Sequence, residues 1–164
     1  MSHDYHDVYP RIKSGDVILW DFGILTPIIK RITGKVYLRC GLAWRLPNGE
    51  ITVLGTGIFS PMTFVKSLST KAPFYWVATD LEITHDVRKY ALTVLREHLT
   101  LKESFENIIN RLKNRDFNTA CARYLTCILY KGKFGLVISK AEYSISELVR
   151  LMKFKKFLMI RVSR

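Results

Sequence analysis

The tripeptide Pro47-Asn48-Gly49 constrains the fold of this chain more than any other local feature. It lies between two runs of strand-like composition, 36–46 and 51–54. Asn and Gly readily adopt the positive φ angles that the tight turn of a β-hairpin requires. The sequence therefore predicts two antiparallel strands here, and a fold that is built at least partly on an antiparallel sheet.

Short apolar segments and turn signals alternate along the rest of the chain, without a repeat or a low-complexity linker. Strand composition recurs at 17–20, 74–78 and 157–162. Capping residues that precede apolar residues at helical spacing predict helices at 26–34, 60–68, 84–98, 144–152, and from about 119 to 132 or 135. The predicted class is α+β, with a small, mostly antiparallel sheet and helices packed against it.

The length of 164 residues supports one hydrophobic core and argues against a second domain. We therefore expect a single domain over 1–164, in which the mostly polar residues 1–10 form a flexible N-terminal arm. Apolar residues make up 48% of the chain and charged residues 24%, which is ordinary for a globular protein. No apolar run reaches the roughly 20 residues that cross a bilayer, and residues 1–10 hold no signal-peptide core. The sequence thus predicts a protein that is cytoplasmic as synthesised.

The cysteine content also indicates a protein made in the reducing cytoplasm. Cys40, Cys121 and Cys127 are too few and too unevenly spaced for a disulfide framework. The chain has neither a Cys-x-x-Cys pair nor a histidine-rich stretch that would indicate a metal site. We expect no metal, no cofactor and a reducing compartment.

The charge is the least ordinary property of the composition. The chain has 26 Lys and Arg against 14 Asp and Glu, a formal net charge of +12. Such a field favours an anionic polymer or an anionic surface as a partner, although dispersed charge can also serve solubility alone. The basic residues gather in three groups: Lys30, Arg31, Lys35 and Arg39; Arg111, Lys113 and Arg115; Lys153, Lys155, Lys156, Arg161 and Arg164.

Several short motifs occur in a distinctive order. They are Gly15-Asp16-Val17-Ile18-Leu19, Thr33-Gly34, Tyr37-Leu38-Arg39-Cys40-Gly41-Leu42, Cys121-Ala122-Arg123-Tyr124-Leu125, and a helix that begins at Ser144. In order and spacing, these motifs resemble the circularly permuted papain-like fold of the NlpC cell-wall peptidase superfamily. The resemblance spans nearly the whole chain and implies one α+β domain with a cysteine nucleophile at the start of a helix.

The resemblance places Cys121 in the slot of that nucleophile. A cysteine in the first turn of a helix lies near unpaired N–H groups, which favour its thiolate form. The family places its catalytic histidine two residues before the glycine of a strand, and here that position is Arg39. Arginine is always protonated near neutral pH and cannot act as a general base.

The third catalytic group is missing as well. Leu54 falls about where the family has a polar residue, with Thr52 and Thr56 as the nearest substitutes. The four histidines, His3, His6, His85 and His98, do not match the family position. The resemblance therefore implies a site that is degenerate at its catalytic histidine.

Three interpretations follow. In the first, the chain is a catalytically degenerate relative that binds another protein in an assembly, such as a bacteriophage tail or virion. In the second, it is an active cysteine peptidase, amidase or thioesterase that uses Cys121 with His85 or His98 as the base. In the third, it binds nucleic acid through basic and aromatic residues such as Arg111, Lys113, Arg115, Tyr124 and Tyr130. The missing histidine weighs against catalysis, and the sequence carries no signal for oligomeric state.

Overall fold

The computed structural model describes residues 2–21, 26–33, 37–56, 63–68, 73–79, 81–97, 124–129 and 143–163. Their frame is a seven-stranded mixed sheet with the strand order β1-β7-β6-β2-β3-β4-β5. The strands are β1 (Ser2–Asp4), β2 (Val17–Asp21), β3 (Tyr37–Arg45), β4 (Ile51–Thr56), β5 (Thr63–Ser67), β6 (Phe74–Val77) and β7 (Met159–Ser163). Of the neighbouring pairs in this sheet, only β1 and β7 run parallel. The predicted α+β class with a mostly antiparallel sheet is confirmed.

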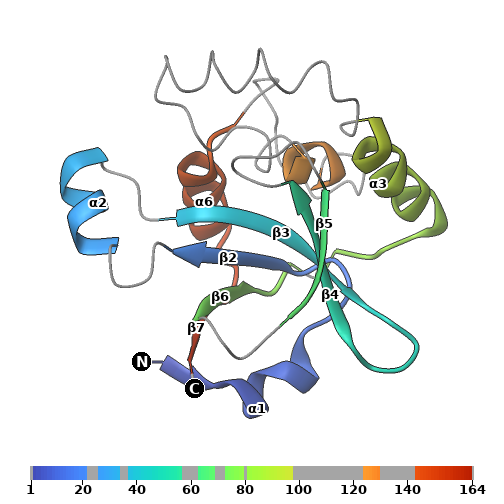
Figure 1. Ribbon diagram of the computed structural model, residues 1–164, viewed down its shortest axis with the longest axis horizontal. Helices are drawn as coiled ribbons and strands as arrows, with labels where there is room; N and C mark the ends of the chain where they lie inside the picture. Colours follow the sequence, from blue (N-terminus) through green and yellow to red (C-terminus); the bar gives the residue numbers. More distant parts are fainter. Residues whose placement is uncertain are drawn as a thin grey trace.

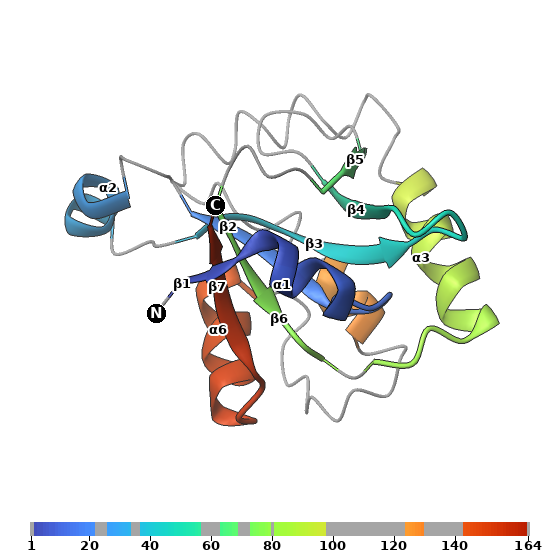
Figure 2. The same ribbon diagram turned by 90° about the horizontal axis from the view of Figure 1, so that it is seen from below.

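Helices cover both faces of the sheet. Their bounds are α1 (Tyr5–Val8) with a following 3₁₀ turn (Tyr9–Arg11), α2 (Thr26–Thr33), α3 (His85–Glu97), 124–129, and α6 (Ile145–Phe154). Figure 1 shows α3, α6 and the helix 124–129 on one side of the sheet and α1 on the other. Seen from below, α1 lies across the strands (Figure 2). Within the described ranges, no helix combines the length and the apolar character that crossing a membrane requires.

The sheet is buried on both faces, and strand alternation divides its side chains between two cores. The helical core lies under α3, α6 and the helix 124–129, and its strand residues include Val17, Leu19, Cys40, Leu42 and Leu54. The N-terminal core lies on the other face and includes Val8, Ile12, Ile18, Val53 and Trp76. Because each face of β2 contacts a core, its residues Val17-Ile18-Leu19 form a continuous apolar run instead of an alternating one.

The local signals of the sequence produce the expected elements at the hairpin and at α6. The amide of Gly49 donates to the carbonyl of Leu46 over 2.9 Å, and Gly49 has a φ of +85°. Ser144 caps α6: its hydroxyl accepts from the amide of Glu147 at 3.2 Å, and the Glu147 carboxylate accepts from the amide of Ser144 at 2.8 Å. The predictions for this hairpin and for the start of α6 are confirmed.

The helix predicted at 60–68 is wrong over Thr63–Ser67, which form the edge strand β5. This strand pairs with β4 along its length, from Thr52 opposite Ser67 to Thr56 opposite Thr63. Thr63, Phe64 and Val65 have β-branched or aromatic side chains, which fit a pleated surface. The open edge of β4 therefore outweighs the Ser60-Pro61 helix signal, whose own residues lie outside the described ranges.

The N-terminal segment, which we expected to be a flexible arm, is instead packed as a structural layer. Strand β1 pairs with β7, and Asp4 caps α1 by accepting from the amide of His6 at 2.7 Å. Val8 and Ile12, four residues apart, are fully buried. The polar residues around them mask this apolar spacing in the sequence.

Candidate functional site

Cys121, the predicted nucleophile, lies outside the described residues. The residues that follow it are described: 124–129 form a helix whose Tyr124, Leu125, Ile128 and Leu129 are fully buried in the helical core. Burial raises the pKa of the Tyr124 hydroxyl well above its usual range. The helix predicted from about 119 is confirmed for 124–129, and it packs against the face of the sheet that carries Cys40 and Leu42.

Arg39, at the position of the family histidine, lies on the other face of the sheet. It pairs with Trp20 of β2, and its guanidinium carbon lies 5.6 Å from the centroid of the Trp20 ring. Trp20 packs against the N-terminal core. Cys40, the residue after Arg39, is fully buried in the helical core on the opposite face, as strand alternation predicts for consecutive residues. Arg39 and the helix 124–129 thus lie on opposite faces.

A β-bulge precedes Arg39. Trp20 pairs with Arg39, but the next residue of β2, Asp21, pairs with Tyr37, so one residue of β3 is skipped. A bulge bends its strand and changes the direction of the side chains beyond it. The skipped position lies before Arg39, so the alternation from Gly41 back to Arg39 is uninterrupted and these two residues share a face of the sheet.

The position of the family's third catalytic group, Leu54, has no polar side chain either. Leu54 is buried in the helical core opposite Leu42. The Thr52 hydroxyl donates to the carbonyl of Trp44 at 3.1 Å, within its own hairpin. Leu54 faces the helix 124–129 whereas Arg39 faces away from it. The two positions that the family would use together are therefore not brought together by this sheet.

Three of the four histidines are described, and all three are exposed: His3, His6 and His85. His85 is the first residue of α3, whose Val87 and Ala91 share the helical core with the helix 124–129. His98 lies outside the described residues. Where side chains are described, no three of His, Cys, Asp and Glu are grouped to hold a metal ion.

The Gly15-Asp16 motif has a structural role. Asp16 is buried, and its carboxylate accepts from the amide of Lys13 at 2.8 Å, the indole N–H of Trp76 at 2.8 Å and the amide of Thr79 at 3.1 Å. Gly15 has a φ of +101°, and a Cβ there would lie 2.5 Å from the carbonyl oxygen of Leu81. The motif therefore joins the start of β2 to the end of β6.

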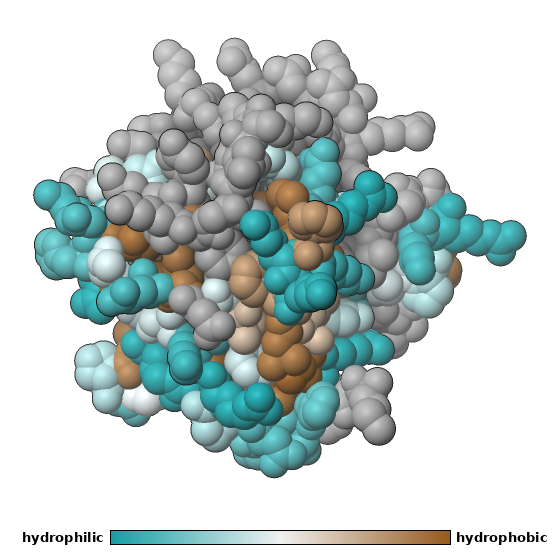
Figure 3. Space-filling view, turned by 180° about the vertical axis from the view of Figure 1, so that it is seen from behind, coloured by the Kyte–Doolittle hydropathy of each residue, from teal (hydrophilic) through white to brown (hydrophobic). Residues whose placement is uncertain are grey.

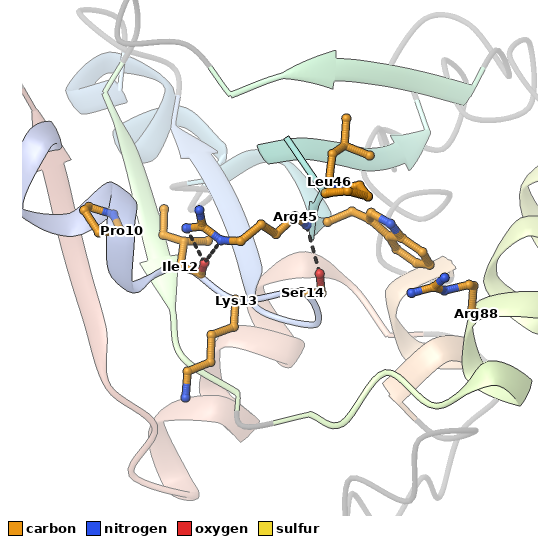
Figure 4. Close-up of a pocket in the computed structure, with 9 residues that line it drawn as sticks. Pro10, Ile12, Lys13, Ser14, Arg45, Leu46 and Arg88 are labelled. Atoms are coloured by element: carbon orange, nitrogen blue, oxygen red, sulfur yellow. Dashed lines mark hydrogen bonds between the residues drawn. The ribbon is translucent and has the colours of Figure 1, made fainter. Parts of the chain in front are cut away.

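One pocket, of about 440 Å³, lies between the 3₁₀ turn, the β3–β4 hairpin and α3 (Figure 4). Arg45 reaches across it and donates to the carbonyls of Tyr9 (2.6 Å), Ile12 (2.8 Å) and Gly49 (3.1 Å). Arg45 thus fastens the N-terminal segment to the hairpin. The guanidinium of Arg88 lies 5.1 Å from the centroid of the Trp44 ring.

A second pocket, of about 570 Å³, is lined by three cationic side chains, Arg11, Lys13 and Lys156. The guanidinium of Arg11 lies 5.3 Å from the centroid of the Trp76 ring. Asp16 is the one carboxylate in the lining, and three donors already occupy its oxygens. Sequence reasoning identified Lys156 as part of a basic group but missed Arg11 and Lys13. The buried Ile12 between these two exposed cations was the available signal.

Of the residues proposed for nucleic-acid binding, the structure describes only Tyr124. Arg111, Lys113, Arg115 and Tyr130 lie outside the described residues. Tyr124 is fully buried, so its ring is inaccessible for stacking on a base. This part of the nucleic-acid prediction is wrong.

No protein-family model matches this chain, and no curated protein matches it. The resemblance to the NlpC superfamily is therefore carried by the motifs and their order alone.

Proposed function

We propose that this chain is a catalytically inactive relative of the NlpC-type papain-like proteins, in which the fold serves a binding or assembly role. One observation carries the proposal. The residue at the histidine position is Arg39, and it lies over Trp20 on the face of the sheet opposite the helix 124–129.

The chemistry supports this interpretation. A cysteine nucleophile needs a base that accepts and returns its proton, and that base is usually held by a third polar group. Arginine stays protonated, and the buried Leu54 offers no polar atom to orient a base. The two family positions, Arg39 and Leu54, therefore supply neither partner for a thiol at Cys121.

The test is iodoacetamide alkylation across a pH series, mapped by peptide mass spectrometry to each cysteine. We expect Cys121 to react like an ordinary thiol with a pKa of about 8.5, or not at all. Cys40 is the internal control, because a fully buried thiol stays unreactive while the protein is folded. Fast reaction of Cys121 with an apparent pKa below about 7 would overturn the proposal.

The Arg39→His variant sharpens this test. Because position 39 faces the N-terminal core, a histidine there should leave the reactivity of Cys121 unchanged. An increase in the reactivity of Cys121 would show that the side chain at position 39 reaches the thiol and that a catalytic dyad has been restored.

One alternative function has an observation in its favour. Helix α3 begins at His85 and shares a core with the helix 124–129, so a base from α3 could approach the thiol from the same face. This cysteine-hydrolase alternative requires a reactive Cys121 that His85→Ala or His98→Ala silences. Unchanged reactivity in both variants would exclude it.

The assembly role suits a component of a bacteriophage tail or virion, because phages use such folds to cross the cell wall and a structural role can persist without catalysis. The protein should then remain with purified particles through density-gradient separation. Its absence from the particle proteome would remove this part of the proposal.

A further inference from the structure

The turn between α6 and β7 has an unusual surface. We call residues 153–158 the Lys-Phe turn; they read Lys153-Phe154-Lys155-Lys156-Phe157-Leu158. Phe154 is 82% exposed and Leu158 48% exposed, and they are two of the four large hydrophobic side chains that the described residues expose. Its three lysines are exposed as well.

The turn projects from the body of the fold. Figure 2 shows the C-terminal end of α6 and its return into β7 at the edge of the molecule. Figure 3 views the molecule from that side and shows a strip of hydrophobic surface bordered by hydrophilic residues. Exposed apolar side chains at a projecting turn are positioned to contact a membrane or another protein.

Glycine would fit the backbone conformation at position 156 of the turn better than the lysine found there. The amide of Lys156 donates to the carbonyl of Lys153 (2.9 Å), and the amide of Phe157 donates to that of Met152 (3.1 Å). This is a Schellman motif with Lys156 in the left-handed position, at a φ of +59°, where glycine is usual. A lysine at this position therefore costs stability relative to glycine.

Lys156 also links the turn to the pocket of about 570 Å³, in which it lies with Arg11 and Lys13. With Lys153 and Lys155, five cations lie on or beside the Lys-Phe turn. The single carboxylate in the pocket, Asp16, is buried and already accepts three hydrogen bonds. The pocket is therefore suited to the phosphate of an anionic headgroup.

We propose that the Lys-Phe turn and this pocket form a docking surface for an anionic phospholipid membrane. Phe154 and Leu158 enter the boundary between headgroups and acyl chains, while the lysines stay at the level of the lipid phosphates. The pocket holds one headgroup phosphate between Arg11, Lys13 and Lys156. The proposal is independent of the reactivity of Cys121.

A membrane explains these side chains better than a nucleic acid does. Leucine does not stack on bases, and in this pocket the guanidinium of Arg11 already lies over the Trp76 ring. A single-stranded nucleic acid could stack a base on Phe154 but would leave Leu158 in water. A lipid surface uses both the charges and the apolar side chains.

The experiment is sedimentation of the full chain with vesicles of phosphatidylcholine alone or with added phosphatidylserine. We expect binding to the phosphatidylserine vesicles, weakening as salt is raised, and little binding to phosphatidylcholine. Lys156→Gly should weaken binding about fivefold, since one basic residue near an anionic surface contributes about that factor. Lys89→Gln, at an exposed lysine of α3, is the matched control and should bind like wild type.

Phe154→Ser tests insertion separately from charge. It should reduce vesicle binding at least tenfold, and it cannot disturb the core because Phe154 is already exposed. Ile28→Ser, at an exposed apolar residue of α2, is its control. Wild-type binding by Phe154→Ser would overturn the proposal. Salt-sensitive binding of single-stranded oligonucleotide, together with no binding to the phosphatidylserine vesicles, would replace it with a nucleic-acid surface.

Discussion

Single side chains show where this fold uses its polar groups. The carboxylate of Asp16 satisfies three donors from three parts of the chain, and Arg45 satisfies three backbone carbonyls. Both residues are ionisable and lie beside pockets, which is a common sign of a functional site. Here their hydrogen bonds identify them as structural, and they hold the N-terminal segment and β6 against the start of β2.

Asp16→Asn should lower the free energy of unfolding by about 1–3 kcal/mol, because an amide N–H₂ then faces a backbone or indole donor without an acceptor. Urea unfolding followed by tryptophan fluorescence measures the change. Glu82→Gln, at an exposed loop position, is the control and should stay within about 0.5 kcal/mol of wild type. An equally small change for Asp16→Asn would contradict the hydrogen-bond network described above.

Lys156→Gly should raise the free energy of unfolding by about 0.5 kcal/mol. A left-handed residue with a Cβ costs about 1–2 kcal/mol, and the greater backbone entropy of unfolded glycine offsets part of the gain. The neighbouring Lys155 has a φ of −76°, so Lys155→Gly should instead destabilise the protein by about 0.5–1 kcal/mol. Thermal unfolding of the two variants should therefore shift in opposite directions.

At the scale of elements, local chemistry was predictable and pairing between distant segments was not. The hairpin at Asn48-Gly49 and the capping box of α6 depend on residues within a few positions of each other. Strand β5 forms because β4 has an open edge, and which face of β3 the helices cover depends on how the sheet and the helices pack. Both are tertiary effects, and for that reason the sequence misassigned 63–67 and could not show which face Arg39 occupies.

Ser144→Ala should cost about 1 kcal/mol of stability, because it removes the acceptor that caps the first turn of α6. Ser146→Ala, two residues further into the same helix, is the matched control. It should be neutral or slightly stabilising, since alanine is the better helix former. If both variants behaved alike in urea unfolding, the capping box would carry no energetic weight.

For the whole molecule, the N-terminal segment matters more than its composition suggests. It buries the second face of the sheet through Val8 and Ile12, and Tyr5 donates from its hydroxyl to the carbonyl of Leu68 at 3.2 Å. Without this layer, Ile18, Val53 and the rest of the N-terminal core would be exposed. The segment is therefore part of the domain rather than an appendage to it.

Stability should fall as the pH rises from 10 to about 12. Burial, with smaller contributions from the charge and hydrogen bond of Tyr9, raises the pKa of Tyr5 from 10.0 to about 12. The folded protein therefore favours the neutral phenol, while the unfolded chain ionises near pH 10. Its stabilising contribution is complete below pH 10 and is lost as the pH rises toward 12.

Urea midpoints measured across this range test the expectation. Lysines also titrate there, so the informative quantity is the difference between wild type and Tyr5→Phe. The variant should start less stable, because it loses the hydrogen bond to Leu68, but should decline less steeply with pH. Parallel slopes would show that the ionisation of Tyr5 is the same in the folded and unfolded states.

The parallel pairing of β1 with β7 has a consequence for biosynthesis. Ser2 lies opposite Arg161, so β1 waits for a partner that is synthesised after all the other strands of this sheet. A ribosome emits β1 to β6 well before β7, and the sheet cannot close at this edge until the C-terminal segment leaves the exit tunnel. During that interval the apolar side chains that Ile160 and Val162 will cover remain accessible to chaperones and to other nascent chains.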